Sequence, residues 1–65
     1  MLGKRIKELR KRKGWSQQKL AEKSILSFNT ITRIERGIVD SPTLKTLLKL
    51  ADALSVSLDE LVGRT

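Results

Sequence analysis

Apolar residues recur at helical spacing along the whole chain, in short segments divided by residues that start or end helices. Leu2, Ile6 and Leu9, for example, fall on one face of a helix that Gly14 would end in the left-handed conformation. Alternation at period two, the pattern of a half-buried strand, is missing from the sequence. The spacing therefore predicts five short helices, at residues 2–13, 17–23, 28–36, 43 or 44 to 54, and about 58–62.

Hydroxyl residues stand where three of these helices should begin. Ser16 and Ser27 can each accept a hydrogen bond from a free amide of the first turn. Ser57 and Glu60 have the spacing of a capping box. The apolar faces that follow predict a core with Trp15 as its lid, built from Leu20, Ala21, Ile31, Ile34, Leu44, Leu47, Leu48, Ala51 and Leu54.

A chain of 65 residues is long enough for one small domain, so we expect a single all-α, compact bundle of five short helices over residues 1–65. Hydrophobic residues make up 38% of it and charged residues 32%, a balance too apolar for disorder and too polar for a membrane protein. Neither a bilayer-spanning stretch nor a secretory signal is present, so the sequence favours a cytoplasmic protein.

Two residue types that carry much of protein chemistry are missing. Without cysteine the chain forms no disulfide, thiolate metal site or cysteine nucleophile, which fits a reducing cytosol. Without histidine it lacks the usual general base at neutral pH and the commonest zinc ligand. We therefore expect no enzyme activity, no metal and no cofactor.

Positive charge is concentrated in the first third of the chain. Lysine and arginine number 14 against seven acidic residues, which gives a net charge of +7. Nine of the basic residues fall within 1–23, where Glu8 and Glu22 oppose them, and the remaining residues carry five of each sign. A domain this basic indicates a polyanionic partner, nucleic acid first and an anionic membrane second. The simpler interpretation is a solvated helix face that aids solubility.

The second and third predicted helices, joined by a short connection, have the layout of a helix-turn-helix at about 17–36. The segments SQQKLAEKS, TITRIERG and SPTLKTLLKLADALSVSLDEL resemble lambdoid phage repressors, Cro proteins and the wider XRE family of transcriptional regulators, from about residue 6 to residue 62. The resemblance implies a lambda-repressor-like DNA-binding domain whose second motif helix enters the major groove. It also implies a prokaryotic or phage transcriptional repressor that binds paired half-sites on double-stranded DNA as a homodimer, with no small-molecule ligand evident.

The predicted helix at 28–36 carries a polar arc opposite its two isoleucines. At about 100° per residue, Asn29, Thr32 and Arg33 lie on this arc. Arginine can pair with guanine and asparagine with adenine in the major groove, so we predict that these three residues read bases. An ordinary solvated face is the alternative. Phe28 lies between the two arcs, where it can either cap the core or touch a thymine methyl, and the family favours the groove.

Other positions are assigned to the DNA backbone, partly through the resemblance. In the family the glutamine that matches Gln17 binds phosphate and often braces the recognition helix, and the amides at a helix N-terminus attract the same anion. The further phosphate contacts that we predict are Ser27, Arg36, Thr43 and Lys45. The resemblance also implies that Arg10 and Glu35 form a buried or half-buried structural ion pair, which removes Arg10 from the DNA-binding residues.

One residue departs from the family pattern. Ile25 stands where the family usually has glycine, in the turn between the motif helices, at a position that typically needs a positive φ. That conformation costs a β-branched residue about 1–2 kcal/mol or more, so either the turn differs here or the strain is tolerated.

The C-terminal part, around residues 54–62, is where we expect the dimer surface. Exposed Val56 and Leu58 would indicate it, whereas packing of these side chains under the first helix is the alternative. Two other functions would use the same sequence features. An antitoxin-like or other protein-interaction module would bind DNA only secondarily, and a membrane-surface peptide would need a wider apolar face than the first helix provides.

Overall fold

Five helices follow one another in the computed structural model, which describes residues 2–39 and 42–63. They are α1 (Leu2–Arg12), α2 (Gln17–Ser24), α3 (Phe28–Glu35), α4 (Leu44–Leu54) and α5 (Leu58–Val62). The prediction of an all-α fold with five short helices is confirmed, and the helix boundaries lie within one residue of their expected places. Two expected pieces, the loop at Asp40 and Ser41 and the tail at Arg64 and Thr65, lie outside the described residues.

Local hydrogen bonds set where α2, α3, α4 and α5 begin. Ser16 Oγ accepts a bond from a first-turn amide of α2 at 3.0 Å, and Ser27 and Thr43 cap α3 and α4 in the same way. Ser57 and Glu60 form the predicted capping box, with reciprocal bonds of 3.1 and 3.2 Å. Each cap joins residues three positions apart, so these helix starts are encoded locally.

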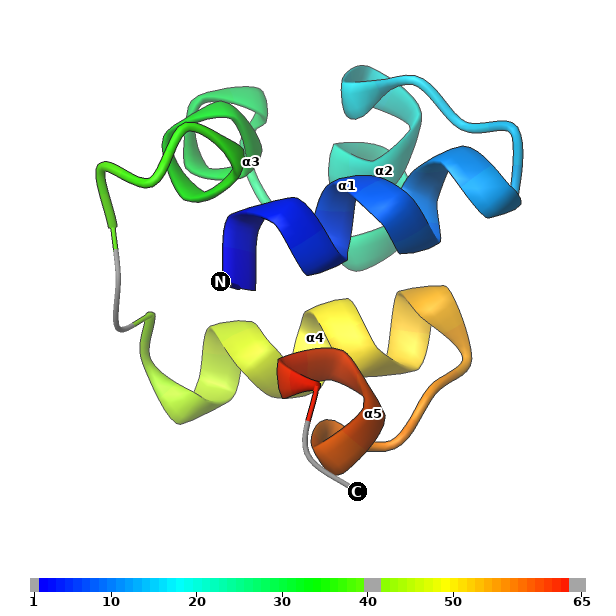
Figure 1. Cartoon of the computed structure of the whole chain (residues 1–65). Helices are drawn as coiled ribbons and strands as arrows, with labels where there is room; N and C mark the ends of the chain where they lie inside the picture. The colour runs from blue at the N-terminus through cyan, green and yellow to red at the C-terminus, as the bar shows by residue number, and fades with distance from the viewer. Residues whose placement is uncertain (1, 40–41, 64–65) are drawn as a thin grey trace.

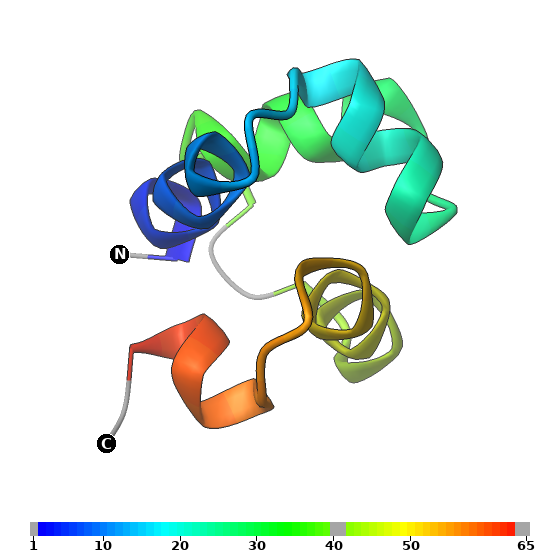
Figure 2. The ribbon, with the colours of Figure 1, turned by 90° about the vertical axis from the view of Figure 1, so that its right-hand side faces the viewer.

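The helices form two layers around one apolar core. In both ribbon views α1, α2 and α3 make the upper layer and α4 and α5 the lower one (Figures 1 and 2). The end of α3 and the start of α4 meet the same edge of the molecule, at the left of Figure 1. Trp15 packs partly buried against this core, as predicted. The buried core side chains are Ile6, Leu9, Leu20, Ala21, Ile31, Ile34, Leu50, Ala51, Leu54 and Leu61.

The inner face of α4 differs from the predicted stripe. Leu50, which the stripe omits, is completely buried, whereas Leu44 and Leu48 are 62% and 45% exposed. Ala51 and Leu54 are buried, as predicted. At about 100° per residue, the three buried residues centre on a direction roughly 70° from Leu44 and roughly 110° from Leu48. The two leucines were wrongly assigned to the core, because Leu44 lies to the side of the buried face and Leu48 lies beyond its edge.

Two C-terminal residues, Val56 and Leu58, pack inward. Of the two alternatives for them, exposure at a dimer surface or packing in the core, the structure favours packing, because both are partly buried against the core. A bond from α1 holds this segment in place, because Arg5 Nε donates to the Glu60 carbonyl at 2.9 Å. Val62, at the end of α5, is the large apolar side chain that stays exposed here.

The turn between α2 and α3 keeps a left-handed residue in spite of its isoleucine. Ile25 has φ 57° and ψ 43°. Its amide donates to the Glu22 carbonyl at 3.3 Å, and the Leu26 amide donates to the Ala21 carbonyl at 3.0 Å, which together end α2. The sequence left open whether the turn differs from the family's or tolerates the strain. The structure keeps the left-handed conformation at Ile25, so the strain is tolerated. The Ile25 side chain is 81% exposed, so it gains little packing in return.

Ile25→Gly should raise the free energy of unfolding by about 1 kcal/mol. Removing the Cβ relieves about 1–2 kcal/mol of left-handed strain, and the greater freedom of glycine in the unfolded chain cancels part of that gain. Urea unfolding followed by Trp15 fluorescence measures the change. Lys19→Gly, at an exposed position inside α2, is the control and should destabilise. Equal losses in the two variants would contradict the strain at Ile25.

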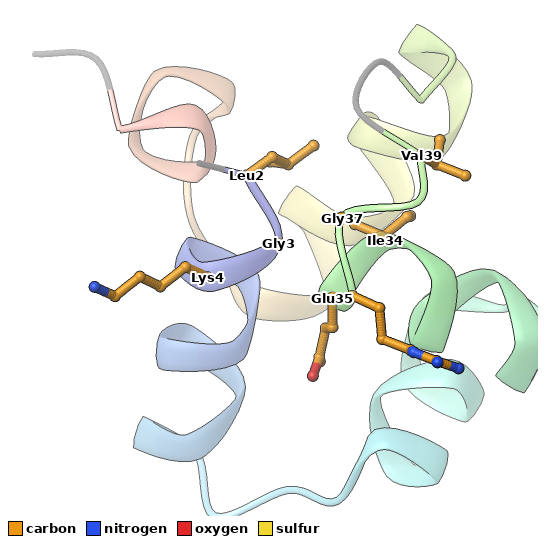
Figure 3. Close-up of a pocket in the computed structure, with 8 residues that line it drawn as sticks. Leu2, Gly3, Lys4, Ile34, Glu35, Gly37 and Val39 are labelled. Atoms are coloured by element: carbon orange, nitrogen blue, oxygen red, sulfur yellow. The ribbon is translucent and has the colours of Figure 1, made fainter.

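α1 and α3 approach each other closely at Gly3. A Cβ built on this glycine would overlap the Ile34 carbonyl oxygen and lie 2.9 Å from the Glu35 carbonyl oxygen. Figure 3 shows the first turn of α1 beside the end of α3, next to a hollow of about 480 Å³ bordered by Leu2, Ile34 and Val39. Glycine is therefore required here for close packing, not for a special φ.

Candidate nucleic-acid interface

α3 presents its polar side to solvent. Asn29 and Arg33 are exposed and Thr32 is partly buried, while Ile31 and Ile34 are buried on the opposite side. The buried isoleucines fix the rotation of the helix about its axis. Turning the polar side inward would bury an unpaired arginine, which is costly. Asn29, Thr32 and Arg33, three of the four residues predicted to read bases, therefore lie together on one accessible face.

Phe28 and Arg36 lie at the two ends of this face. Phe28 is the first residue of α3 and is 48% exposed, so it is not sealed in the core. α3 ends at Glu35, one residue earlier than predicted, because Gly37 turns the chain with φ 79°. Arg36 is thus an exposed C-cap residue instead of a helical one.

Ser27 caps α3 with the hydroxyl that was predicted to contact phosphate. Its Oγ accepts from the Thr30 amide at 3.1 Å and lies 2.8 Å from Thr30 Oγ1. Any phosphate contact by this hydroxyl has to be made alongside the cap.

Gln17, the first residue of α2, is bonded to the end of α3. Its Nε2 donates to Glu35 Oε1 at 3.1 Å. A primary amide nitrogen carries two hydrogens, so the second remains for an anion at the start of α2. This bond joins α2, which is predicted to contact the DNA backbone, to α3, which is predicted to read bases.

Arg10 and Glu35 form a buried ion pair. Arg10 Nε donates to Oε2 of Glu35 at 2.8 Å, and Nη2 donates to Oε1 at 3.1 Å. The two side chains are 9% and 3% exposed. The third guanidinium nitrogen, Nη1, donates to the Trp15 carbonyl at 2.8 Å. Together with Gln17 the pair makes a network that joins α1, α2 and α3, and the Arg10 guanidinium is committed to it.

The start of α4 lies beside α3. Thr43 Oγ1 accepts from the Thr46 amide at 3.2 Å and donates to Thr46 Oγ1 at 3.1 Å, and Lys45 is exposed in the same turn. The structure therefore brings Arg33, predicted to read a base, close to Thr43, predicted to contact phosphate. They share a hollow of about 240 Å³ lined by Thr30, Arg33, Ile34, Val39, Pro42, Thr43 and Thr46.

Several basic residues of the first third are engaged within the protein. Arg5 and Arg10 make the internal bonds described above. The Nζ atoms of Lys13 and Lys23 lie 5.3 and 5.9 Å from the centre of the Trp15 ring, within cation–π range. Lys13 is two residues from Trp15 in the sequence, whereas the fold brings Lys23 to Trp15 and Arg5 to the Glu60 carbonyl, and no spacing in the sequence indicates these two contacts.

Across residues 2–39 and 42–63, no helix combines the length and the apolar character that crossing a bilayer requires. The same residues contain no group of three acidic side chains placed to hold a metal ion. In this part of the chain, every buried side-chain nitrogen and oxygen has a hydrogen-bond partner. The polar groups left for a ligand therefore lie at the surface.

Solved structures of other proteins have the same arrangement of helices. The structure of SinR, described as the master regulator for biofilm formation, in complex with DNA matches with a TM-score of 0.91 at 39% identity, over 95% of this chain and 98% of that one. The restriction-modification controller protein C.AhdI from Aeromonas hydrophila matches with a TM-score of 0.87 at 42% identity, over 92% of this chain and 89% of that one. At these identities the likeness covers sequence as well as fold.

Curated sequences agree with the structural comparison. The HTH-type transcriptional regulator ImmR of Bacillus subtilis (strain 168) is 43% identical over 63 residues, which are 97% of this chain and 49% of ImmR. SinR of the same strain is 39% identical over 62 residues, 95% of this chain and 56% of SinR. The chain thus spans about half the length of these relatives. A family model described as helix-turn-helix matches residues 6–61, and the chain therefore belongs to the helix-turn-helix family.

Proposed function

We propose that this chain binds double-stranded DNA in a sequence-specific manner and regulates transcription, as a repressor. The proposal rests on the outward polar face of α3, where Asn29, Thr32 and Arg33 lie together on an accessible side. A helix with such a face fits the major groove, and the helix starts of α2 and α4 favour phosphate. Relatives named as transcriptional regulators, and SinR solved with DNA, support this function.

Each side chain of the interface has a role in this proposal. Arg33 pairs with guanine and Asn29 with adenine, because these side chains match the paired hydrogen-bonding groups of those bases. Gln17 gives its second amide hydrogen to a backbone phosphate. The remaining phosphate contacts come from Ser27, Arg36, Thr43 and Lys45.

Two copies of the chain would occupy one DNA site. The half-sites of such dimers lie about one helical turn apart, and their symmetry follows that of the protein. Val56 and Leu58 are partly buried, so the apolar side chains available to a second copy include Val62, within the predicted segment, and the exposed Leu44 and Leu48 of α4. The function needs no metal, cofactor or catalysis, and it places the protein in the prokaryotic cytoplasm with its DNA.

Selection from a random duplex pool, at low salt and at near-physiological salt, tests the function. We expect a two-fold-symmetric motif that is still enriched at the higher salt. Binding without sequence preference that disappears as salt rises would mean that the net charge of +7 explains it entirely. A protein-interaction module, such as an antitoxin, would then be the better assignment.

Arg33→Ala and Gln17→Ala should weaken binding in different ways. We expect Arg33→Ala to lose about 1–3 kcal/mol on the preferred site and to relax the preference at one base pair, because a base contact is removed. Gln17→Ala should weaken the preferred site and a scrambled duplex equally, because phosphate contacts carry no sequence information. Fluorescence anisotropy titrations with both duplexes separate the two patterns. Equal losses on both duplexes for Arg33→Ala would make Arg33 a phosphate contact.

A further inference from the structure

The Thr32 hydroxyl is turned toward the backbone of its own helix. Its Oγ1 donates to the Asn29 carbonyl at 2.9 Å, so its single hydrogen is already in use. Threonine takes two rotamers in a helix, and this bond selects one of them. What Thr32 offers outward is its methyl group and, at most, an acceptor oxygen.

Phe28 lies one helical turn before Thr32. Residues four apart on a helix are neighbours on its surface, with Cβ atoms about 5–6 Å apart. The Phe28 side chain is half exposed, although burial of an aromatic ring is strongly favourable. The outward side of α3 therefore carries two adjacent apolar groups, a ring and a methyl, beside the polar side chains of Asn29 and Arg33.

A pair of adjacent apolar groups has one counterpart among the base edges in the major groove. Guanine, cytosine and adenine present hydrogen-bonding groups there, whereas thymine alone adds a C5-methyl. We propose that Phe28 and Thr32 form a slot for a thymine methyl, so that Thr32 reads by its methyl group and not by its hydroxyl. This proposal rests on the proposed function and names the base that this part of α3 selects.

Replacing thymine with uracil tests the slot without altering the protein. Starting from the selected site, each thymine is changed to uracil in turn, which removes only the methyl. We expect one position per half-site to lose about three- to fivefold in affinity, the value of one buried methyl-sized group. The other thymines should change little.

Two variants of Thr32 then separate the methyl from the hydroxyl. Thr32→Val keeps the methyl and should keep the preference for thymine over uracil, whereas Thr32→Ser keeps the hydroxyl and should lose it. Phe28→Ala should also lose the preference. Thr30→Ser is the matched control, because it removes the same methyl group from a partly buried position of α3. It should leave the preference for thymine over uracil unchanged.

The outcomes distinguish the slot from the proposed function. A selected site that is insensitive to uracil everywhere would overturn the slot and leave sequence-specific binding intact. Loss of the preference in Thr32→Val with retention in Thr32→Ser would show that the hydroxyl is the reader, and would also overturn it. Failure to select any preferred duplex would overturn both.

Discussion

Replacing Glu35 with alanine should lower the free energy of unfolding by about 3–5 kcal/mol, because the Arg10 guanidinium stays buried without its counter-charge. The change removes both charge-assisted bonds from Arg10 and the acceptor of the Gln17 amide. A domain of 65 residues has about 3–10 kcal/mol of stability in total. The loss is a large part of that total, so the variant should unfold at a much lower urea concentration than the unmodified chain.

Urea unfolding followed by circular dichroism and Trp15 fluorescence measures this loss. Glu8→Ala is the matched control, because it removes the same charge from an exposed position of α1 and should change stability by less than about 0.5 kcal/mol. The double variant Arg10→Met, Glu35→Leu should recover most of the stability, since apolar residues of similar volume often replace a buried pair without loss. If Glu35→Ala costs no more than Glu8→Ala, the pair contributes as little as a surface pair.

Gly3→Ala should cost about 1–3 kcal/mol, although alanine is the better helix former by about 1 kcal/mol. The added methyl would overlap the Ile34 carbonyl oxygen, and backbone atoms cannot move aside as a flexible side chain can. α1 must therefore shift away from the end of α3. That shift would loosen the contact on which the position of the reading face depends.

Thermal and urea unfolding of Gly3→Ala test this prediction. Lys4→Ala, at the next position of α1, is exposed and should be close to neutral. Hydrogen exchange adds a local measurement, because amides of α1 and the last turn of α3 should lose protection more than those of α4. A variant more stable than the unmodified chain would show that the two helices separate without cost.

The number, type and limits of the helices could be predicted from the sequence because their signals are local. Ser16 and Ser27 satisfy amides three residues away, and Gly14 and Gly37 supply the left-handed residues at helix ends. The extent of burial on α4 could not be predicted in the same way. A helical wheel shows that Leu44 and Leu48 share a side, but which side is covered depends on where the other helices pack.

In the candidate site, too, features within one helix could be predicted from the sequence, whereas most contacts between helices could not. The outward face of α3 follows from the two isoleucines opposite it, which is a pattern within one helix. A brace from Gln17 to α3 was expected only through the family resemblance, and its partner is Glu35. The Arg5–Glu60 bond and the close approach at Gly3 also join different helices, and no pattern in the sequence indicates them. In the sequence, Gly3 indicates only a position of low helix propensity in α1. The residues next to it do not show that α3 packs against it.

The network of Arg10, Glu35 and Gln17 has a consequence for genetics. Gln17, which we propose contacts phosphate, lies at the start of α2, and its amide is held by the carboxylate that pairs with a buried arginine. Under the proposed function, a screen for loss of repression would return substitutions of Arg10 and Glu35 together with those of the proposed reading face, although neither residue is proposed to contact DNA. Second-site suppressors would sort them: a change that restores packing would rescue the first class, whereas only a matching change in the operator would rescue the second.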